Sequence, residues 1–262
     1  MTAPEPGNDC ASTNEFAVSM RAVDKSFGAL RVFSRLDLDV RRGETFTVVG
    51  GSGTGKSVLL RLIIGLLKPD RGAVIVCGTD VVPLGERALR TLRRKVGMVF
   101  QGAALFDSMS VGDNVAYGLV EQLEWPAPKI RARVAECLEW VGLPGIERKR
   151  PAELSGGMKK RVGIARALAP GPDVILYDEP TTGLDPFNTR RVNELIRSLQ
   201  ERLGVTSIVI THDMQSAFAV SDRIGLIDRR RIELVLDAAE AERAPPPALS
   251  AFVHGEPMES NS

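Results

Sequence analysis

The sequence predicts an α/β fold with a largely parallel sheet and an inserted helical subdomain, and three observations support this prediction. Short apolar runs alternate with helical patterns along most of the chain, as they do where helices connect parallel strands. A glycine-rich loop lies between one such strand and the helix that follows it. The stretch 103–169 interrupts the alternation, because it has almost no strand pattern and contains Pro-marked turns.

The individual elements follow from the apolar pattern in chain order. We expect strands at Thr45–Val49, Ala73–Cys77, Val96–Phe100, Val174–Tyr177, Ser207–Thr211 and Ile224–Ile227. We expect helices at Lys56–Leu66, Ile130–Val141, Gly157–Ala169, Thr189–Leu203 and Met214–Val220. Strands this apolar are typical of a sheet that helices cover on both faces.

The composition divides the chain into three segments. Residues 1–15 are small, polar and Pro-containing, which indicates a loose N-terminal tail. Residues 16–237 are expected to form the folded domain, with the helical subdomain at about 103–169. Residues 238–262 include three consecutive prolines, so we interpret them as a C-terminal tail for subunit contacts and not as part of the core.

Charge and hydropathy exclude several classes of protein. The chain has 262 residues, and its 34 Lys and Arg against 33 Asp and Glu give a net charge of +1, which argues against a free-standing nucleic-acid binder. The longest apolar stretch, Val58–Leu67, is interrupted by Arg61 and is shorter than the ~20 residues of a membrane span. The N-terminus lacks the basic and apolar regions of a secretory signal. We therefore expect a cytoplasmic chain without a nucleic-acid partner.

The strongest motif is the glycine-rich loop, which fits the phosphate-binding pattern G-x-x-x-x-G-K-[ST] as Gly50, Gly51, Ser52, Gly53, Thr54, Gly55, Lys56 and Ser57. Its glycines let successive backbone N–H groups point at phosphate oxygens, and the next helix N-terminus adds a positive dipole end. Lys56 supplies a charge for the β- and γ-phosphates, and the Ser57 hydroxyl is a hard oxygen ligand for Mg²⁺. A glycine-rich turn without function is unlikely to match all these positions between a strand and a helix.

Two further segments offer groups for the same chemistry. Asp178 and Glu179 follow an apolar strand; beside the phosphate loop, Asp178 suits the Mg²⁺ shell and Glu179 suits a base that polarises water. Ser155, Gly156 and Gly157 precede a basic, Ala-rich helix, and their backbone donors suit an anion. Taken alone, Ser155 serves equally well as an ordinary helix N-cap.

Five motifs in one order resemble the nucleotide-binding subunit of an ABC transporter. They are the phosphate loop, Leu154–Met158, Asp178–Glu179, Gly183–Asp185 and Thr211–Asp213, and the resemblance covers about Phe16–Val235. It implies an ABC cassette of the RecA-like P-loop NTPase class with an inserted helical subdomain. It also implies ATP hydrolysis with Mg²⁺ by a homodimer that forms around two ATP molecules.

The resemblance assigns roles to single residues. It implies Glu179, His212 and Gln101 as the catalytic group: Glu179 activates water, His212 contacts the γ-phosphate, and Gln101 senses the metal and the water. It implies Ser57, Gln101 and Asp178 as the Mg²⁺ group. It implies nucleotide contacts from Phe27 on adenine, from residues 50–57 and Val58, and across the dimer from Ser155, Gly156, Gly157 and Asp185.

Three of these positions depart from the family pattern. Val58 replaces the usual Thr, which removes a hydroxyl near the α-phosphate, and Met158 replaces the usual Gln of the segment that contacts the opposite nucleotide. Phe27 replaces the commoner Tyr, which leaves stacking intact, and core packing is a rival interpretation of this residue.

A narrower resemblance concerns transport. Phe100–Val111, Asn114–Tyr117 and Tyr177–Pro186 look like the ATPase of Mla-type phospholipid transport systems. This implies phospholipid transport between membranes from the cytoplasmic face of the inner membrane. It implies as partners a separate MlaE-like permease, an MCE-domain lipid-binding protein and a small STAS-domain subunit. Apolar residues at 103–106 suit docking of a permease helix, and they suit packing of the helical subdomain equally well.

Two other functions remain open from the sequence. One is the ATPase of an ABC importer for a small solute. The other, which the sequence favours least, is a non-transport ABC ATPase acting on ribosomes or DNA, because such proteins usually carry two cassettes or a long coiled coil.

Overall fold

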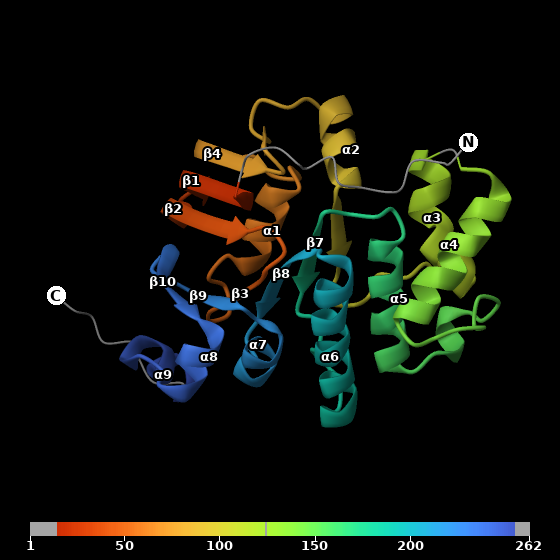
Figure 1. Cartoon of the computed structure of the whole chain (residues 1–262). Coiled ribbons are helices and arrows are strands. Elements are labelled where there is room, and N and C mark those ends of the chain that lie inside the picture. The colour runs from red at the N-terminus through yellow and green to blue at the C-terminus, as the bar shows by residue number, and fades with distance from the viewer. Residues whose placement is uncertain (1–14, 124, 255–262) are drawn as a thin grey trace.

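Two sheets organise the chain in the computed structural model, which describes residues 15–123 and 125–254. The first sheet is antiparallel, in the order β2-β1-β4-β5, with strands β1 (Phe16–Phe27), β2 (Leu30–Arg41), β4 (Arg71–Val76) and β5 (Thr79–Asp80). The second sheet has the order β10-β9-β3-β8-β7-β6, with strands β3 (Thr45–Val49), β6 (Val96–Val99), β7 (Val174–Asp178), β8 (Thr206–Thr211), β9 (Arg223–Asp228) and β10 (Arg231–Asp237). Figure 1 shows them as neighbouring layers.

Helices cover these sheets and form a separate layer at one side (Figure 1). Around the sheets lie α1 (Lys56–Ile63), α2 (Glu86–Arg94), α6 (Pro186–Leu203), α7 (Met214–Val220), α8 (Ala238–Arg243) and α9 (Pro247–His254). The lateral layer consists of α3 (Val111–Leu123), α4 (Ala127–Trp140) and α5 (Gly156–Leu168), with a 3₁₀ turn at Pro151–Glu153. This layer contains the stretch in which the sequence predicts only helices.

Each layer has its own apolar core. Leu59, Leu60, Leu62 and Ile63 of α1 are fully buried in a cluster that also contains side chains from both sheets. A second cluster joins α3, α4 and α5 to α6 and to one face of the six-stranded sheet. Because α1 begins directly after the phosphate-binding loop, its burial fixes the end of that loop in the core.

The parallel register brings the candidate residues to one edge of the six-stranded sheet. Val49, the last residue of β3, pairs with Thr211, and Asp178 pairs with Ile210. Val99 pairs with Tyr177 on the next strand. The loops after β3, β6, β7 and β8 therefore leave the sheet side by side at its carboxyl edge, where open α/β sheets bind ligands.

The predicted α/β class is confirmed, while several elements differ from expectation. The strand expected at Ala73–Cys77 forms as β4, but it belongs to the antiparallel sheet and not to the parallel one. The long strands β1 and β2 have no sequence prediction, because bulges in their pairing disturb the alternation of buried and exposed residues. The helix expected to extend to Leu66 ends at Ile63. None of the helices in the described part of the chain is long and apolar enough to cross a membrane.

The expectation that 238–262 adds nothing to the core is wrong for the part that the structure describes. Ala238 and Ala241 of α8 and Leu249 of α9 are buried in a cluster with Ala217 of α7 and Leu226 of β9. The three prolines end α8 and begin α9 without preventing either helix. Residues 1–14 of the N-terminal tail predicted at 1–15 lie outside the described residues, as do residues 255–262.

Replacement of Leu249 by Ala tests this C-terminal packing. Because Leu249 is fully buried, we expect Leu249→Ala to lower the free energy of unfolding by about 2 to 5 kcal/mol in denaturant titration. The matched control is Leu66→Ala at a site that is 55% exposed, for which a change within about 0.5 kcal/mol is expected. Equal stability of the two variants would mean that α9 does not contribute to the core.

Candidate active site

The phosphate-binding loop is closely packed where it leaves β3. A Cβ atom on Gly50 would lie 2.5 Å from Cγ2 of Ile227 and 2.7 Å from its carbonyl oxygen, so only glycine fits there. Lys56 folds back over the loop, and its Nζ donates to the carbonyl oxygens of Gly50 (2.6 Å) and Gly51 (2.8 Å). The loop thus holds a lysine ammonium close to its backbone, which places a positive charge at the loop.

The half-buried ammonium of Lys56 lies near two carboxylates, those of Glu179 and Asp178. Burial lowers the pKa of Lys56, while the nearby carboxylates of Glu179 and Asp178 act in the opposite direction. A bound phosphate would supply further negative charge beside the ammonium and would stabilise its charged form. The site is therefore suited to a polyanion.

Ser57 and Asp178 meet next to this lysine. The Ser57 hydroxyl donates to Oδ1 of Asp178 at 3.4 Å. Burial raises the pKa of Asp178, and the hydrogen bond from Ser57 lowers it in part. A hydroxyl and a half-buried carboxylate form the all-oxygen pair that suits Mg²⁺, and the cation would compensate the burial of the carboxylate.

Glu179 lies at the centre of a hydrogen-bonded group. Its Oε1 is 2.8 Å from Nδ1 of His212, and its Oε2 accepts from the hydroxyls of Thr182 (3.0 Å) and Thr211 (3.3 Å). The Glu179 side chain is largely buried, whereas the His212 side chain is mostly exposed. The carboxylate is thus held by three partners at the sheet edge, beside an exposed imidazole.

Gln101 joins this group through its backbone. Its side chain is exposed, and its carbonyl oxygen accepts a hydrogen bond from the ammonium of Lys160 in α5. No sequence pattern pointed to Lys160 or to the hydroxyls of Thr182 and Thr211. The basic pair at 159–160 was the available signal for Lys160, but it does not distinguish a buried lysine from a solvated one.

The residues expected to contact a second nucleotide form a different group. Ser155 caps α5, where its hydroxyl accepts from the N–H of Met158 at 3.3 Å. Asp185 caps α6 and accepts from the side chain of Asn188 at 2.5 Å, and hydrogen bonds from Asn188 lower the pKa of Asp185. A Cβ on Gly157 would lie 2.6 Å from Oδ1 of Asn188, so the starts of α5 and α6 are packed against each other.

Within the described chain, no hydrogen bond or ion pair connects this second group to the phosphate-binding loop. In one copy of the chain the two groups of candidate residues are therefore separate. Phe27 lies at the end of β1, is 45% exposed, and has the ammonium of Lys25 at 5.2 Å from its ring centre. This exposure favours stacking over the core-packing interpretation. Val58 is only partly buried and packs against the apolar cluster that contains Leu59 and Leu60 of α1.

Sequence and structure comparisons identify the class that this fold and site define. A family model described as ABC transporter matches residues 33–182. A methionine import ATP-binding protein, MetN 2 from Rhodococcus jostii, is 47% identical over 90% of this chain and 71% of its own. The chain belongs to the ABC transporter family, and it is an ATP-hydrolysing subunit of that family.

Other relatives agree on the class and differ in their named substrates. A probable ribonucleotide transport ATP-binding protein, mkl from Mycobacterium leprae, is 38% identical over 95% of this chain and 72% of its own. A solved dimeric cassette, MJ0796 in a post-hydrolysis state with ADP and Pi, superimposes with a TM-score of 0.77 at 32% identity and covers 84% of this chain and 98% of its own. CbiO1 of Clostridium perfringens, part of the transporter complex cbiONQ, has a TM-score of 0.83 at 28% identity, over 92% of this chain and 96% of its own.

These findings confirm the predicted fold class and the ATPase activity. Binding of ATP follows from membership of the family. The narrower phospholipid assignment is not confirmed, because the relatives named above are described by methionine and ribonucleotide transport. The roles of single residues, the Mg²⁺ ligands and the named partners stay predictions.

Alanine substitutions of two neighbouring glycines test the geometry of the loop. We expect Gly50→Ala to lower the free energy of unfolding by about 1 to 3 kcal/mol, because its Cβ overlaps the Ile227 backbone. Gly51→Ala is the control: its nearest neighbour is Cγ2 of Thr54 at 3.8 Å, so a change within about 0.5 kcal/mol is expected. Thermal unfolding of both proteins is the measurement. A Gly50→Ala variant as stable as the control would contradict the close packing of the loop on β9.

Proposed function

We propose that two copies of this chain bind two ATP molecules between them and hydrolyse them to drive a separate membrane permease. The main support is the division of the site described above. The phosphate-binding loop lies at the sheet edge, while Ser155–Gly157 lie at the start of α5, and no hydrogen bond joins the two among the described residues. A second copy facing the first would place its α5 N-terminus, with unpaired N–H groups, opposite the phosphates. The dimeric cassette solved for MJ0796 is a precedent for such pairing.

The residues of the sheet edge have distinct tasks in this proposal. Lys56 binds the phosphate chain, since its ammonium already lies inside the loop. Ser57 and Asp178 would hold Mg²⁺, which neutralises phosphate charge when it is bound. Glu179 accepts the proton of the attacking water, because its carboxylate is kept in place by Thr182 and Thr211 hydroxyls.

The surrounding residues orient this reaction. His212 contacts Glu179 now and is exposed enough to reach a γ-phosphate. Gln101 follows the neighbouring strand β6, and its exposed side chain would contact the metal and the water when they are bound. Phe27, at the end of β1, stacks on adenine. Asp185 of the second copy contacts the nucleotide from across the dimer.

Two substitutions separate catalysis from binding. We expect Glu179→Gln to lower the steady-state rate by about 10²- to 10⁴-fold while ATP still binds, because an amide keeps the shape but cannot take a proton. We expect Lys56→Ala to weaken ATP binding itself. Rates and equilibrium binding of ATP, measured on the same preparations, distinguish the two. Equal ATP affinity in both variants, or normal turnover by Glu179→Gln, would contradict these roles.

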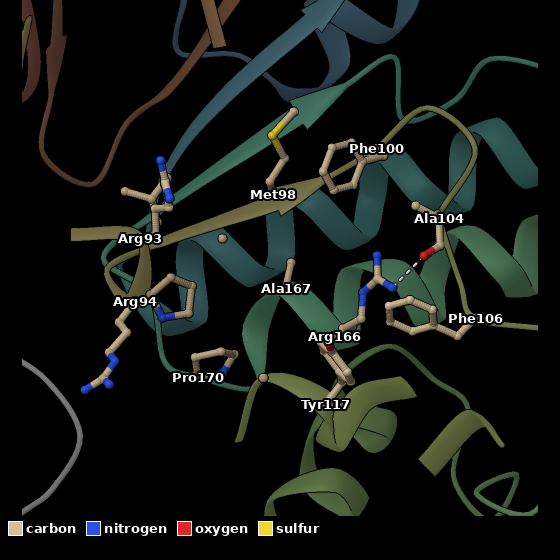
Figure 2. A pocket seen from close by; sticks show the side chains of 14 residues that line it. Arg93, Arg94, Met98, Phe100, Ala104, Phe106, Tyr117, Arg166, Ala167 and Pro170 are labelled. Carbon is tan, nitrogen blue, oxygen red and sulfur yellow. Dashed lines mark hydrogen bonds between the residues drawn. The ribbon is translucent and has the colours of Figure 1, made fainter. Parts of the chain in front are cut away.

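For the substrate, we propose phospholipid transported through an MlaE-like permease, with an MCE-domain protein and a small STAS-domain subunit. The support is the sequence resemblance of the segments around 100–117 and 177–186. Residues of the segment 100–117 line a groove of about 430 Å³, where Phe100, Phe106 and Tyr117 present exposed aromatic rings (Figure 2). An apolar groove of this kind suits a helix from the permease.

Methionine or another small solute is the second candidate substrate. It is favoured by the 47% identity to a methionine import ATP-binding protein. Both candidates share the same ATP chemistry and the same groove, so they differ only in the permease that the groove binds.

Reconstitution of this chain with its membrane permease tests the assignment. We expect ATP-dependent movement of labelled phospholipid between vesicles and none of labelled methionine. The reverse result would overturn the phospholipid proposal and leave the ATPase intact. Phe106→Ser should reduce co-purification with the permease without loss of ATP binding by the isolated chain. The control is Val235→Ser, which removes an exposed apolar side chain from β10, outside the groove.

A further inference from the structure

A buried cation of α5 touches two loops of the active site at once. Lys160 is 7% exposed, and its ammonium donates to the carbonyl oxygens of Gln101 and of Glu179, the latter at 3.3 Å. These two residues follow β6 and β7, which are neighbouring parallel strands. A single side chain therefore connects the lateral helical layer to the loop of the expected base and to the loop beside it.

The contact bears directly on the direction of the Glu179 side chain. Glu179 has a left-handed backbone with φ of 50°, which is strained for a non-glycine residue and persists only where neighbours hold it. Its N–H donates to the carbonyl of Ile210 at 2.9 Å, and its own carbonyl accepts from Lys160. With the peptide groups on both sides of Cα bonded, the carboxylate is directed toward His212 and Thr182.

Lys160 makes this link from a buried position. Desolvation lowers the pKa of Lys160, and the negative charge of Glu179 opposes that effect. An apolar side chain in its place would remove the Lys160 donor from the Gln101 carbonyl, which is costly in a buried setting. The Glu179 carbonyl would keep only its bond from the N–H of Thr182, at 3.3 Å. Arg166, farther along α5, donates to the carbonyls of Ala104 (2.6 Å) and Ala103 (3.1 Å), and Figure 2 shows the first of these bonds. The loop after β6 is thus attached to α5 at three carbonyls.

We propose that Lys160 is a positioning residue: it sets the Glu179 carboxylate and the Gln101 loop relative to α5. Since α5 begins at Ser155–Gly157, the same ammonium links the proposed contact with the opposite nucleotide to the proposed base of its own subunit. The inference rests on the proposed roles of Glu179 and Ser155–Gly157. It adds that a displacement of α5 reaches Glu179 through this one side chain.

The first test compares substitutions of adjacent lysines. We expect Lys160→Met to lower kcat about 10- to 100-fold, with the dissociation constant of ATP and KM within about twofold, because Lys160 lies outside the phosphate-binding loop. Lys160→Arg, which keeps a cation with several donors, should recover most of the rate. The control Lys159→Met removes a neighbouring charge from α5 without a hydrogen bond to either carbonyl, and its kcat should equal that of the unmodified protein.

The second test asks whether Lys160 acts through Glu179. Single-turnover ATP hydrolysis is measured for Lys160→Met, Glu179→Gln and the double variant. If Lys160 positions Glu179, then Lys160→Met should slow the Glu179→Gln protein by much less than it slows the unmodified protein. Equal slowing in both backgrounds would overturn the proposal, and so would an unchanged kcat in Lys160→Met.

The outcomes for the two proposals are distinguishable. Normal turnover by Glu179→Gln would overturn the assigned base, whereas an inactive Glu179→Gln with a fully active Lys160→Met would overturn only the positioning role. Circular dichroism and thermal unfolding establish that each variant is folded. Should Lys160→Met not fold, Lys160→Gln takes its place. Its shorter amide donor retains part of the hydrogen bonding, so we expect a smaller loss of kcat with the same non-additivity, and an unchanged kcat would overturn the proposal.

Discussion

Parallel pairing of β3, β8, β7 and β6 is the constraint on which the rest of this structure depends. In a parallel sheet all carboxyl ends lie at one edge, so four loops that are distant in sequence leave the sheet together. The phosphate-binding loop, the Gln101 loop, Glu179 and His212 are neighbours for this reason. Burial of α1 between the two sheets then fixes the phosphate-binding loop from its other end.

Positive and negative side chains occur in equal number among four charged residues at this edge. Two partly desolvated ammonium groups, on Lys56 and Lys160, lie close to the carboxylates of Asp178 and Glu179. Both lysines use backbone carbonyl oxygens as partners, which leaves the carboxylates available for other groups.

The helical layer lies at the side of the molecule, yet one of its helices, α5, contacts the loops of the candidate active site. It contains the α5 N-terminus on one side, and Lys160 and Arg166 of the same helix contact the loop after β6. Docking of a permease on the apolar groove and binding of nucleotide at the start of α5 would therefore act on one rigid element. The buried cluster that joins α5 to α3, α4 and α6 makes that element stiff.

Local pattern by itself determined the phosphate-binding loop, the apolar strands of the parallel sheet and the family, because glycine spacing and unbroken apolar runs are properties of short segments. It predicted β3 and α7 with their observed bounds. It did not determine that β4 belongs to a second sheet, since pairing is a contact between distant segments. It also missed the burial of Leu249 and of Lys160. The local sequence around each residue is equally compatible with a solvent-exposed side chain, because burial depends on which distant segments pack against it. Only the packed fold decided which lysine contacts the carbonyls of Gln101 and Glu179, since that depends on how α5 lies against the ends of β6 and β7.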